Sequence, residues 1–391
     1  MDSKFQRMMV PAIVVALFAA GSARAVTDEE FNALKLKVSE LEAKASTSEE
    51  AAANNNMVLS GNMSLLYSKQ QGGDGGFTLG SVDPIFLYRV GNKLLFECEL
   101  ELEVSSDENG ETATETTIEY AQLDYLLCDE AMLVAGKIVL PMGSFIETSD
   151  PAWINKLPTF PLPRADETAI LPESDIGIEL RGGINAGDGL FNYAAYVVNG
   201  PGHSTETTTD ENGNEVTVET LTFDPVVNQN NSLGYGGRVG FFQPFVEGSD
   251  FEAGISGETG KWDSKGDLSW SAAVFDARLH LTPAIELRGE YMTTKEETLA
   301  GDVKPDGWWA QAAYKLSGLN SDISVLNKTE LVARYAEVNA DNGEGTTKQT
   351  AVGIDYHVAG TFVVKGDYEF NTSDNEDLAK DQLNLQLAVG F

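Results

Sequence analysis

Apolar and polar residues alternate along most of the chain from Met57 to Phe391, and a period of two residues is typical of β-strands. The clearest case is the stretch LLFECELELEVS, residues 94–105. Its acidic face consists of Glu97, Glu99, Glu101 and Glu103, and its apolar face of Phe96, Cys98, Leu100, Leu102 and Val104. The stretches TFVVKGDYEF (361–370) and DQLNLQLAVGF (381–391) divide in the same way. We count about sixteen such segments, separated by Gly, Asn, Asp and Pro clusters.

The connections between these segments alternate in length. Short connections occur near residues 91, 128–130, 185–188, 282–283 and 359–360, and long polar ones at 141–173, 200–231, 295–306 and 340–348. Tight turns at one rim and long loops at the other are typical of bacterial outer-membrane barrels. We therefore predict an all-β fold, a transmembrane antiparallel β-barrel of about 16 strands over residues 57–391, with apolar side chains toward lipid and polar ones toward the lumen. A soluble β-sandwich or β-helix is the alternative.

The first 56 residues carry a different pattern. Lys4 and Arg7 precede the apolar run MMVPAIVVALFAA, and Ala23-Arg24-Ala25 follows it, so residues 1–25 are predicted to be a secretory signal peptide. In residues 26–56, Phe31, Leu34, Val38 and Leu41 have the spacing of a short coiled-coil helix, followed by a polar linker. This helix is too short to form a stable coiled coil alone, so a single periplasmic helix is the alternative.

The charge and the cysteine count restrict the classes of function. The formal net charge is −35, which excludes a nucleic-acid-binding protein. The two cysteines, Cys98 and Cys128, are too few for a disulfide scaffold, and the sequence does not decide whether they are paired. The three histidines are scattered and accompany no nucleophile motif or metal-ligand spacing, so we predict no enzyme, no catalytic residue and no metal site. A hydrolase using His357 is the remaining enzymatic alternative.

The strand pattern assigns charged side chains to the lumen. The predicted pore-lining acids are Glu97, Glu99, Glu101, Glu103, Asp124, Glu179, Glu286, Glu290, Asp367 and Glu369, and the predicted bases are Arg181, Arg238, Arg278, Arg288, Arg334 and Lys365. If the bases gather opposite Glu97–Glu103, a transverse field crosses the pore; if they interleave with acids, they are ion-paired wall residues. In either case the acidic excess favours cations.

The connection 141–173 is rich in Pro, Trp and Phe, which is unusual for a solvent-exposed loop. We predict that it folds into the lumen and narrows the pore, the alternative being that it packs over the rim or at a protomer interface. Its candidate constriction residues are Glu147, Asp150, Trp153, Lys156, Arg164 and Asp166.

Acidic clusters in the long loops offer oxygen ligands. DENG (107–110), DENGN (210–214) and DNGEG (341–345) have the composition of a Ca²⁺ site, although ordinary turn chemistry explains them equally well. No other cofactor is expected.

Two motifs resemble those of outer-membrane porins. Phe391, preceded by apolar residues at every second position, is similar to the signal recognised by the barrel-assembly machinery. GKIVLPMG (136–143) resembles the "GK…PFG" region of the phosphate-selective porin O/P family, and the short helix between signal and barrel is similarly placed. Met142 stands where that family usually has Phe, and the glutamate ladder differs from its anion-selective members. A siderophore-type porin has a similar plan.

The resemblance implies a sixteen-stranded homotrimer in the bacterial outer membrane, in contact with lipid and lipopolysaccharide. The predicted function is a passive diffusion channel for small hydrophilic solutes with a preference for cations. The alternatives are a porin specific for phosphate, a sugar or a siderophore, and a plugged barrel that acts as a structural anchor.

Overall fold

A computed structural model describes residues 56–391, apart from 107–111, 150, 166–167, 210–214, 224–226, 247 and 342–344. The chain divides into two units, Met1–Asn56 and Met57–Phe391. The predicted signal peptide (1–25) and the predicted helix and linker (26–56) lie outside the described residues, Asn56 excepted.

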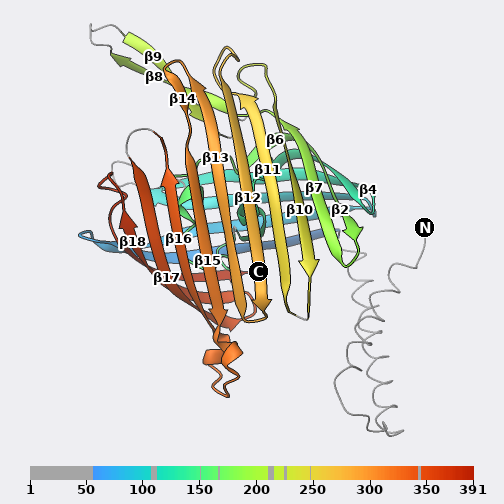
Figure 1. Ribbon diagram of the computed structural model, residues 1–391, viewed down its shortest axis with the longest axis vertical. Helices are drawn as coiled ribbons and strands as arrows, with labels where there is room; N and C mark the ends of the chain where they lie inside the picture. Colours follow the sequence, from blue (N-terminus) through green and yellow to red (C-terminus); the bar gives the residue numbers. More distant parts are fainter. Residues whose placement is uncertain are drawn as a thin grey trace. The chain divides into compact units, whose positions relative to one another are not determined.

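The second unit is a closed antiparallel β-barrel of 16 strands, as the sequence predicted (Figure 1). The sheet closes because β1 pairs with both β2 and β19. The barrel strands are β1 (Met57–Gln70), β2 (Gly75–Val90), β3 (Leu94–Ser106), β4 (Thr112–Cys128), β5 (Ala131–Val139), β6 (Ser174–Ala186), β7 (Gly189–Val198), β10 (Gly234–Pro244), β11 (Asp250–Lys261), β12 (Ser269–Thr282), β13 (Ile285–Thr298), β15 (Asp306–Lys315), β16 (Thr329–Asn339), β17 (Thr346–Ala359), β18 (Phe362–Thr372) and β19 (Gln382–Gly390). A short strand, β14 (Gly301–Val303), pairs antiparallel with the last residues of β13 and is not one of these 16.

The C-terminal residue belongs to the seam of the barrel. The backbone N–H of Phe391 donates to the Gly61 carbonyl at 2.9 Å, and the N–H of Gly61 donates to the Phe391 carbonyl at 3.0 Å. The Phe391 side chain remains 56% exposed. Its main chain therefore helps to close the sheet, whereas its ring contributes little to packing within the protein.

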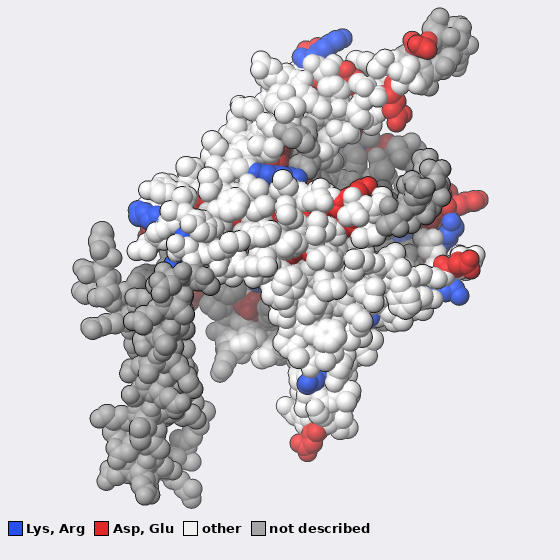
Figure 2. Space-filling view, turned by 180° about the vertical axis from the view of Figure 1, so that it is seen from behind, with Lys and Arg blue, Asp and Glu red and all other residues white. Residues whose placement is uncertain are grey.

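The two faces of each strand differ in composition. On β19, Leu383, Leu385 and Leu387 point outward and are exposed, while Asn384 and Gln386 point inward and are buried. Figure 2 shows one outer face that is mostly uncharged, with charged side chains gathered mainly toward its edges. An apolar belt of this extent is unfavourable in water and favourable in lipid. The fold is therefore that of a membrane-spanning barrel, and the soluble β-sandwich and β-helix alternatives are wrong.

Two connections differ from the predicted pattern. Residues 200–231, expected to be a polar loop, contain the hairpin of β8 (Gly202–Thr209) and β9 (Glu215–Thr222), which projects beyond the barrel strands (Figure 1). At the opposite rim, β15 and β16 are joined by η2 (Leu316–Leu319) and η3 (Leu326–Lys328) instead of a tight turn. Among the described residues, no helix is sufficiently long and apolar to cross a membrane.

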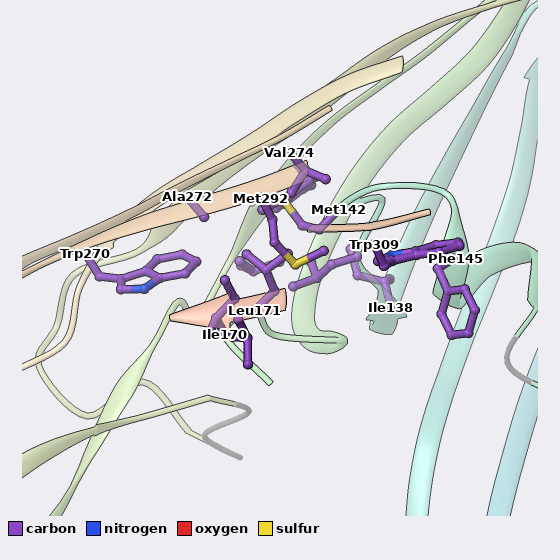
Figure 3. Packing of buried hydrophobic residues seen from close by; sticks show 14 of the residues in the cluster. Ile138, Met142, Phe145, Ile170, Leu171, Trp270, Ala272, Val274, Met292 and Trp309 are labelled. Carbon is purple, nitrogen blue, oxygen red and sulfur yellow. The ribbon is translucent and has the colours of Figure 1, made fainter. Parts of the chain in front are cut away.

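The barrel contains a hydrophobic core on its inner side. Met142 and Phe145, from the connection between β5 and β6, are buried against Met292 and Trp309 of the wall (Figure 3). The Phe145 and Trp309 rings meet edge to face, with centroids 5.4 Å apart. This packing fixes one side of the connection against strands β13 and β15.

Candidate functional site in the barrel lumen

The connection between β5 and β6 lies inside the barrel, against the inner face of the wall. It contains the short helix α3 (Phe145–Ser149) and the 3₁₀ turn η1 (Leu162–Arg164). Three prolines lie in or next to η1. Proline restricts the backbone φ angle and has no N–H group, so fewer backbone donors of this segment need an acceptor inside the confined lumen.

Glu290 of β13 joins both halves of this segment. Its Oε1 accepts hydrogen bonds from the backbone N–H groups of Ser144 (2.7 Å) and Phe145 (2.8 Å). Its Oε2 accepts from Arg164 Nε (3.1 Å) and Nη2 (3.0 Å), and from the indole of Trp309 (3.3 Å). Glu290 and Arg164 are almost completely buried, so their ion pair is shielded from solvent.

Basic side chains of β16 and β18 hold the middle of the segment. Lys365 Nζ donates to the carbonyls of Ala152 (2.5 Å), Asn155 (2.7 Å) and Leu157 (3.4 Å). Arg334 donates to the carbonyls of Thr159 (2.8 Å) and Phe160 (3.0 Å). These two cations therefore bind the main chain of the segment.

The wall has small residues where the segment rests. A Cβ atom on Gly353 would lie 2.5 Å from Leu157 Cδ2, one on Gly390 would lie 2.5 Å from Trp153 Nε1, and one on Gly307 would lie 2.7 Å from Pro163 Cγ. A side chain at these positions would force the facing atoms to move, so the glycines allow the close approach of the segment in its present position.

The opposite wall, formed by β2, β3 and β4, is acidic. Glu99, Glu101 and Glu103 line a cavity of about 490 Å³ between this wall and the segment, and Glu97 lines a neighbouring cavity of about 250 Å³. Asp83 and Glu119 join this cluster. We define Asp83, Glu97, Glu99, Glu101, Glu103 and Glu119 as the acidic wall.

The sequence reasoning did not identify Asp83 or Glu119. A β-bulge displaces the pairing of β3 and β4, since Glu99 lies opposite Tyr120 whereas Leu100 lies opposite Ile118. Glu119 is the extra residue, and it lines the same cavity as Tyr120. A strict alternation along β4 therefore fails at this position.

The predicted lumen bases lie on the other strands, and most of them contact an acidic or polar partner within the protein. Arg238 forms a bidentate pair with Asp276, and Arg278 lies 2.8 Å from Glu252. Arg334 Nη2 lies 3.8 Å from Glu369. Arg288 donates to Ser149 Oγ and stacks near the rings of Phe145 and Trp309, 5.5 and 5.3 Å from their centroids. These four arginines thus lie on strands other than those of the acidic wall, with charges largely compensated locally, whereas Arg181 lines the same cavity as Glu97.

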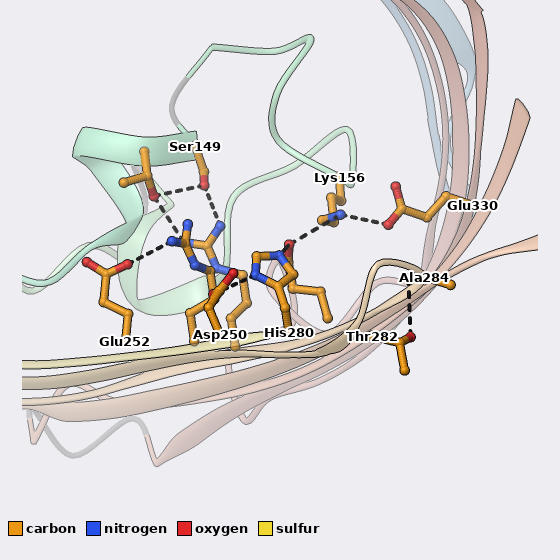
Figure 4. Close-up of polar contacts among 12 residues, drawn as sticks. Ser149, Lys156, Asp250, Glu252, His280, Thr282, Ala284 and Glu330 are labelled. Atoms are coloured by element: carbon orange, nitrogen blue, oxygen red, sulfur yellow. Dashed lines mark hydrogen bonds and ion pairs between the residues drawn. The ribbon is translucent and has the colours of Figure 1, made fainter. Parts of the chain in front are cut away.

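A chain of polar contacts near one rim joins two predicted residues, Lys156 and Glu286, to residues that the sequence analysis did not name (Figure 4). His280 contacts Asp250 through Nδ1 (2.8 Å) and Glu286 through Nε2 (3.0 Å). Lys156 of the inward segment lies 3.6 Å from Glu286 and 2.7 Å from Glu330. The histidine is therefore part of the polar network that anchors this segment.

The remaining predicted residues are placed as follows. Glu147 lies 3.8 Å from Arg181, which is also 3.9 Å from Asp124. Glu179 and Asp367 are buried on inward-facing positions. Asp150, Asp166 and most of the three loop clusters considered for Ca²⁺ lie outside the described residues.

Two further observations concern metals and cysteines. Within the described part of the chain, no group of three or more His, Cys, Asp or Glu side chains is arranged to hold a metal ion. Cys98 and Cys128 are both free thiols.

A curated relative shares part of the sequence. No family model matches the chain. A protein of Aquifex aeolicus (strain VF5), described as an uncharacterized protein, is 28% identical over 251 residues, which are 59% of this chain and 54% of the relative. The chain thus matches about half the length of that relative.

Solved structures of porins share the architecture. The anion-selective porin from Comamonas acidovorans superposes with a TM-score of 0.56 at 12% identity, covering 86% of this chain and 99% of the porin. Salmonella typhi OmpF in complex with daunomycin gives 0.55 at 14% identity, and the Acinetobacter baumannii outer membrane channel DcaP gives 0.52 at 11%; each match covers 86% of this chain and 97% of the other. At these identities the likeness shows the fold, which is that of the bacterial outer-membrane porins.

Proposed function

We propose that the protein is a passive channel of the bacterial outer membrane for small hydrophilic solutes, with a preference for cations. One observation carries the preference: the acidic wall faces the lumen cavities, whereas most lumen bases are neutralised by their own partners. Glu97, Glu101, Glu119 and Asp83 form no ion pair with a Lys or Arg of the described chain.

The size of the effect follows from Coulomb's law. A monovalent cation about 5 Å from one carboxylate is stabilised by about 0.8 kcal/mol at the dielectric constant of water and by about 3 kcal/mol at an effective value near 20. An anion is destabilised by the same amount. Several carboxylates along one wall therefore favour cations even when salt partly screens each of them.

The test is the reversal potential of the folded full-length protein in a planar bilayer under a salt gradient. The variant carries Glu97, Glu99, Glu101 and Glu103 replaced by Gln, and the matched control carries the same change in charge at exposed sites outside the lumen, with Asp302, Asp322, Glu376 and Asp377 replaced by amides. We expect cation-selective conductance that weakens in the lumen variant and persists in the control.

Other outcomes identify the alternatives. Anion selectivity would refute the cation preference and favour the phosphate-type channel that the porin O/P resemblance implies. An absence of conductance would favour a plugged barrel acting as a structural anchor. We further propose, on the resemblance alone, a homotrimer that contacts lipopolysaccharide and is inserted by the barrel-assembly machinery through Phe391. On this proposal the protein is not an enzyme and requires no cofactor.

A further inference from the structure

Glu179 of β6 is a buried carboxylate without a partner. Its side chain is about 1% exposed, and neither carboxylate oxygen accepts a hydrogen bond from any described residue. Glu179 lines a cavity of about 450 Å³ bounded by β5, β6, β7, β10 and the helix α3. Burying a carboxylate without hydrogen-bond donors is strongly unfavourable, so this position favours a ligand that supplies them.

Arg181 presents the complementary chemistry two residues further along the same strand. Side chains at i and i+2 of a strand share a face, with Cα atoms about 6.6 Å apart, and Arg181 lines the same cavity. Its guanidinium makes no hydrogen bond to a described residue, and its nearest carboxylate oxygens lie 3.8 and 3.9 Å away on Glu147 and Asp124. Its side chain is 29% exposed, so its N–H groups face the cavity with unused donor capacity.

Several other polar groups of this cavity are bound to partners within the protein. Arg238 is bound to Asp276, Glu252 to Arg278, and the Tyr193 hydroxyl donates to the Glu130 carbonyl at 2.9 Å. Asp129 and Glu147 also line the cavity, but Glu179 is the carboxylate among them whose two oxygens are buried without a hydrogen bond to a described residue. It shares one strand face with the donor group of Arg181, in a space of the size that encloses small ligands in proteins.

We propose that this cavity is a binding site for a small zwitterion such as an α-amino acid, with its ammonium group at Glu179 and its carboxylate at Arg181. A cation alone would leave the donors of Arg181 unused, and an anion alone would leave Glu179 unsatisfied. The inference rests on the proposed channel function for the route by which the solute arrives, and it adds a class of solute to that function.

The test is equilibrium dialysis of labelled L-alanine against the folded full-length protein in detergent. Ethylammonium and propionate, which carry one charge each, are the comparison ligands. We expect saturable binding of alanine, and a loss of at least tenfold in affinity with Glu179→Gln and, separately, with Arg181→Gln. The control Glu101→Gln removes one lumen carboxylate from the acidic wall and is expected to leave alanine binding unchanged.

Each contrary result overturns the assignment. Absence of saturable alanine binding refutes the site, and equal loss in all three variants shows a general effect of lumen charge. Ethylammonium or propionate binding as tightly as alanine refutes recognition of both charges. Glycerol efflux from liposomes containing the same wild-type protein reports on the channel independently, so failure of the pore and failure of the binding site are distinguished.

Discussion

Replacing Glu290 with glutamine tests how the inward segment 141–173 is held. Glutamine keeps one carbonyl oxygen, which still accepts the N–H groups of Ser144 and Phe145. In the wild-type protein, N–H donors of Arg164 and Trp309 point at Oε2. In the variant an amide N–H₂ group takes the place of Oε2 and cannot accept their hydrogen bonds. Arg164 then keeps only its bond to the Met142 carbonyl while remaining buried.

The expected magnitude follows from which group is left unpaired. Removing one partner of a buried ion pair costs about 3–5 kcal/mol, and we expect Glu290→Gln to lower the free energy of unfolding by that amount. Arg164→Met leaves Glu290 with three N–H donors, from Ser144, Phe145 and Trp309, so its cost is expected to be smaller, about 1–3 kcal/mol. The double variant is expected to be less destabilised than the sum of the two, because no buried cation remains.

The assay is equilibrium urea unfolding of the protein in lipid vesicles, followed by tryptophan fluorescence, together with current noise in a planar bilayer. Glu290→Gln is expected to increase current fluctuations because the segment detaches more often. Glu296→Gln, on the same strand and without a hydrogen bond to described residues, is the control and should change stability by no more than about 0.5 kcal/mol. A larger effect of Arg164→Met than of Glu290→Gln would refute the reasoning.

Three further predictions concern other parts of the barrel. Lys365→Met deprives three carbonyls of their donor and should lower the free energy of unfolding by about 2–5 kcal/mol in the same urea assay, whereas no change would show that water replaces the ammonium group. The Ser264 hydroxyl and backbone N–H both donate to Glu219 and hold its pKa below the usual 4.5, so this contact contributes stability above pH 4.5 and loses it as the pH falls through the lowered pKa. Hydrogen exchange in β9 should rise there, and Ser264→Ala, which removes the hydroxyl but keeps the N–H donor, should weaken this pH dependence. Phe391→Ala should change unfolding by less than about 1 kcal/mol, because the ring is largely exposed, yet reduce the amount of barrel assembled in a bacterial host, and equal losses in both measurements would argue against a separate assembly role.

Strand architecture was predictable because its signal is local. The alternation in residues 94–105 and 381–391 depends only on the period of a strand, and it placed charged residues on the face that the barrel turns inward. The hairpin of β8 and β9 was missed because β8 is polar throughout and β9 has only Val216 and Val218 in alternation, which is too short an apolar period to mark a strand.

The partners of the lumen residues were not predictable, since they depend on closure of the barrel. Arg164 and Glu290 are separated by 126 residues, and Lys365 and Ala152 by 213. The sequence identified each of the four charged residues Lys156, Arg164, Glu290 and Lys365 as a lumen candidate, but not that they bind one another or the segment's main chain. Glu119 was missed because a bulge breaks the alternation.

The long sequence separations within the lumen also set an order for folding. The segment 141–173 precedes β13, β16 and β18 in the chain, yet its anchors Glu290, Arg334 and Lys365 come from those strands. The segment therefore lacks these three anchors until the strands that carry them have formed, and such contacts between residues far apart in the chain are slow to form. A barrel assembled with its last strands delayed would be an open sheet with an unattached segment, so the width of the pore is decided in the final steps of folding.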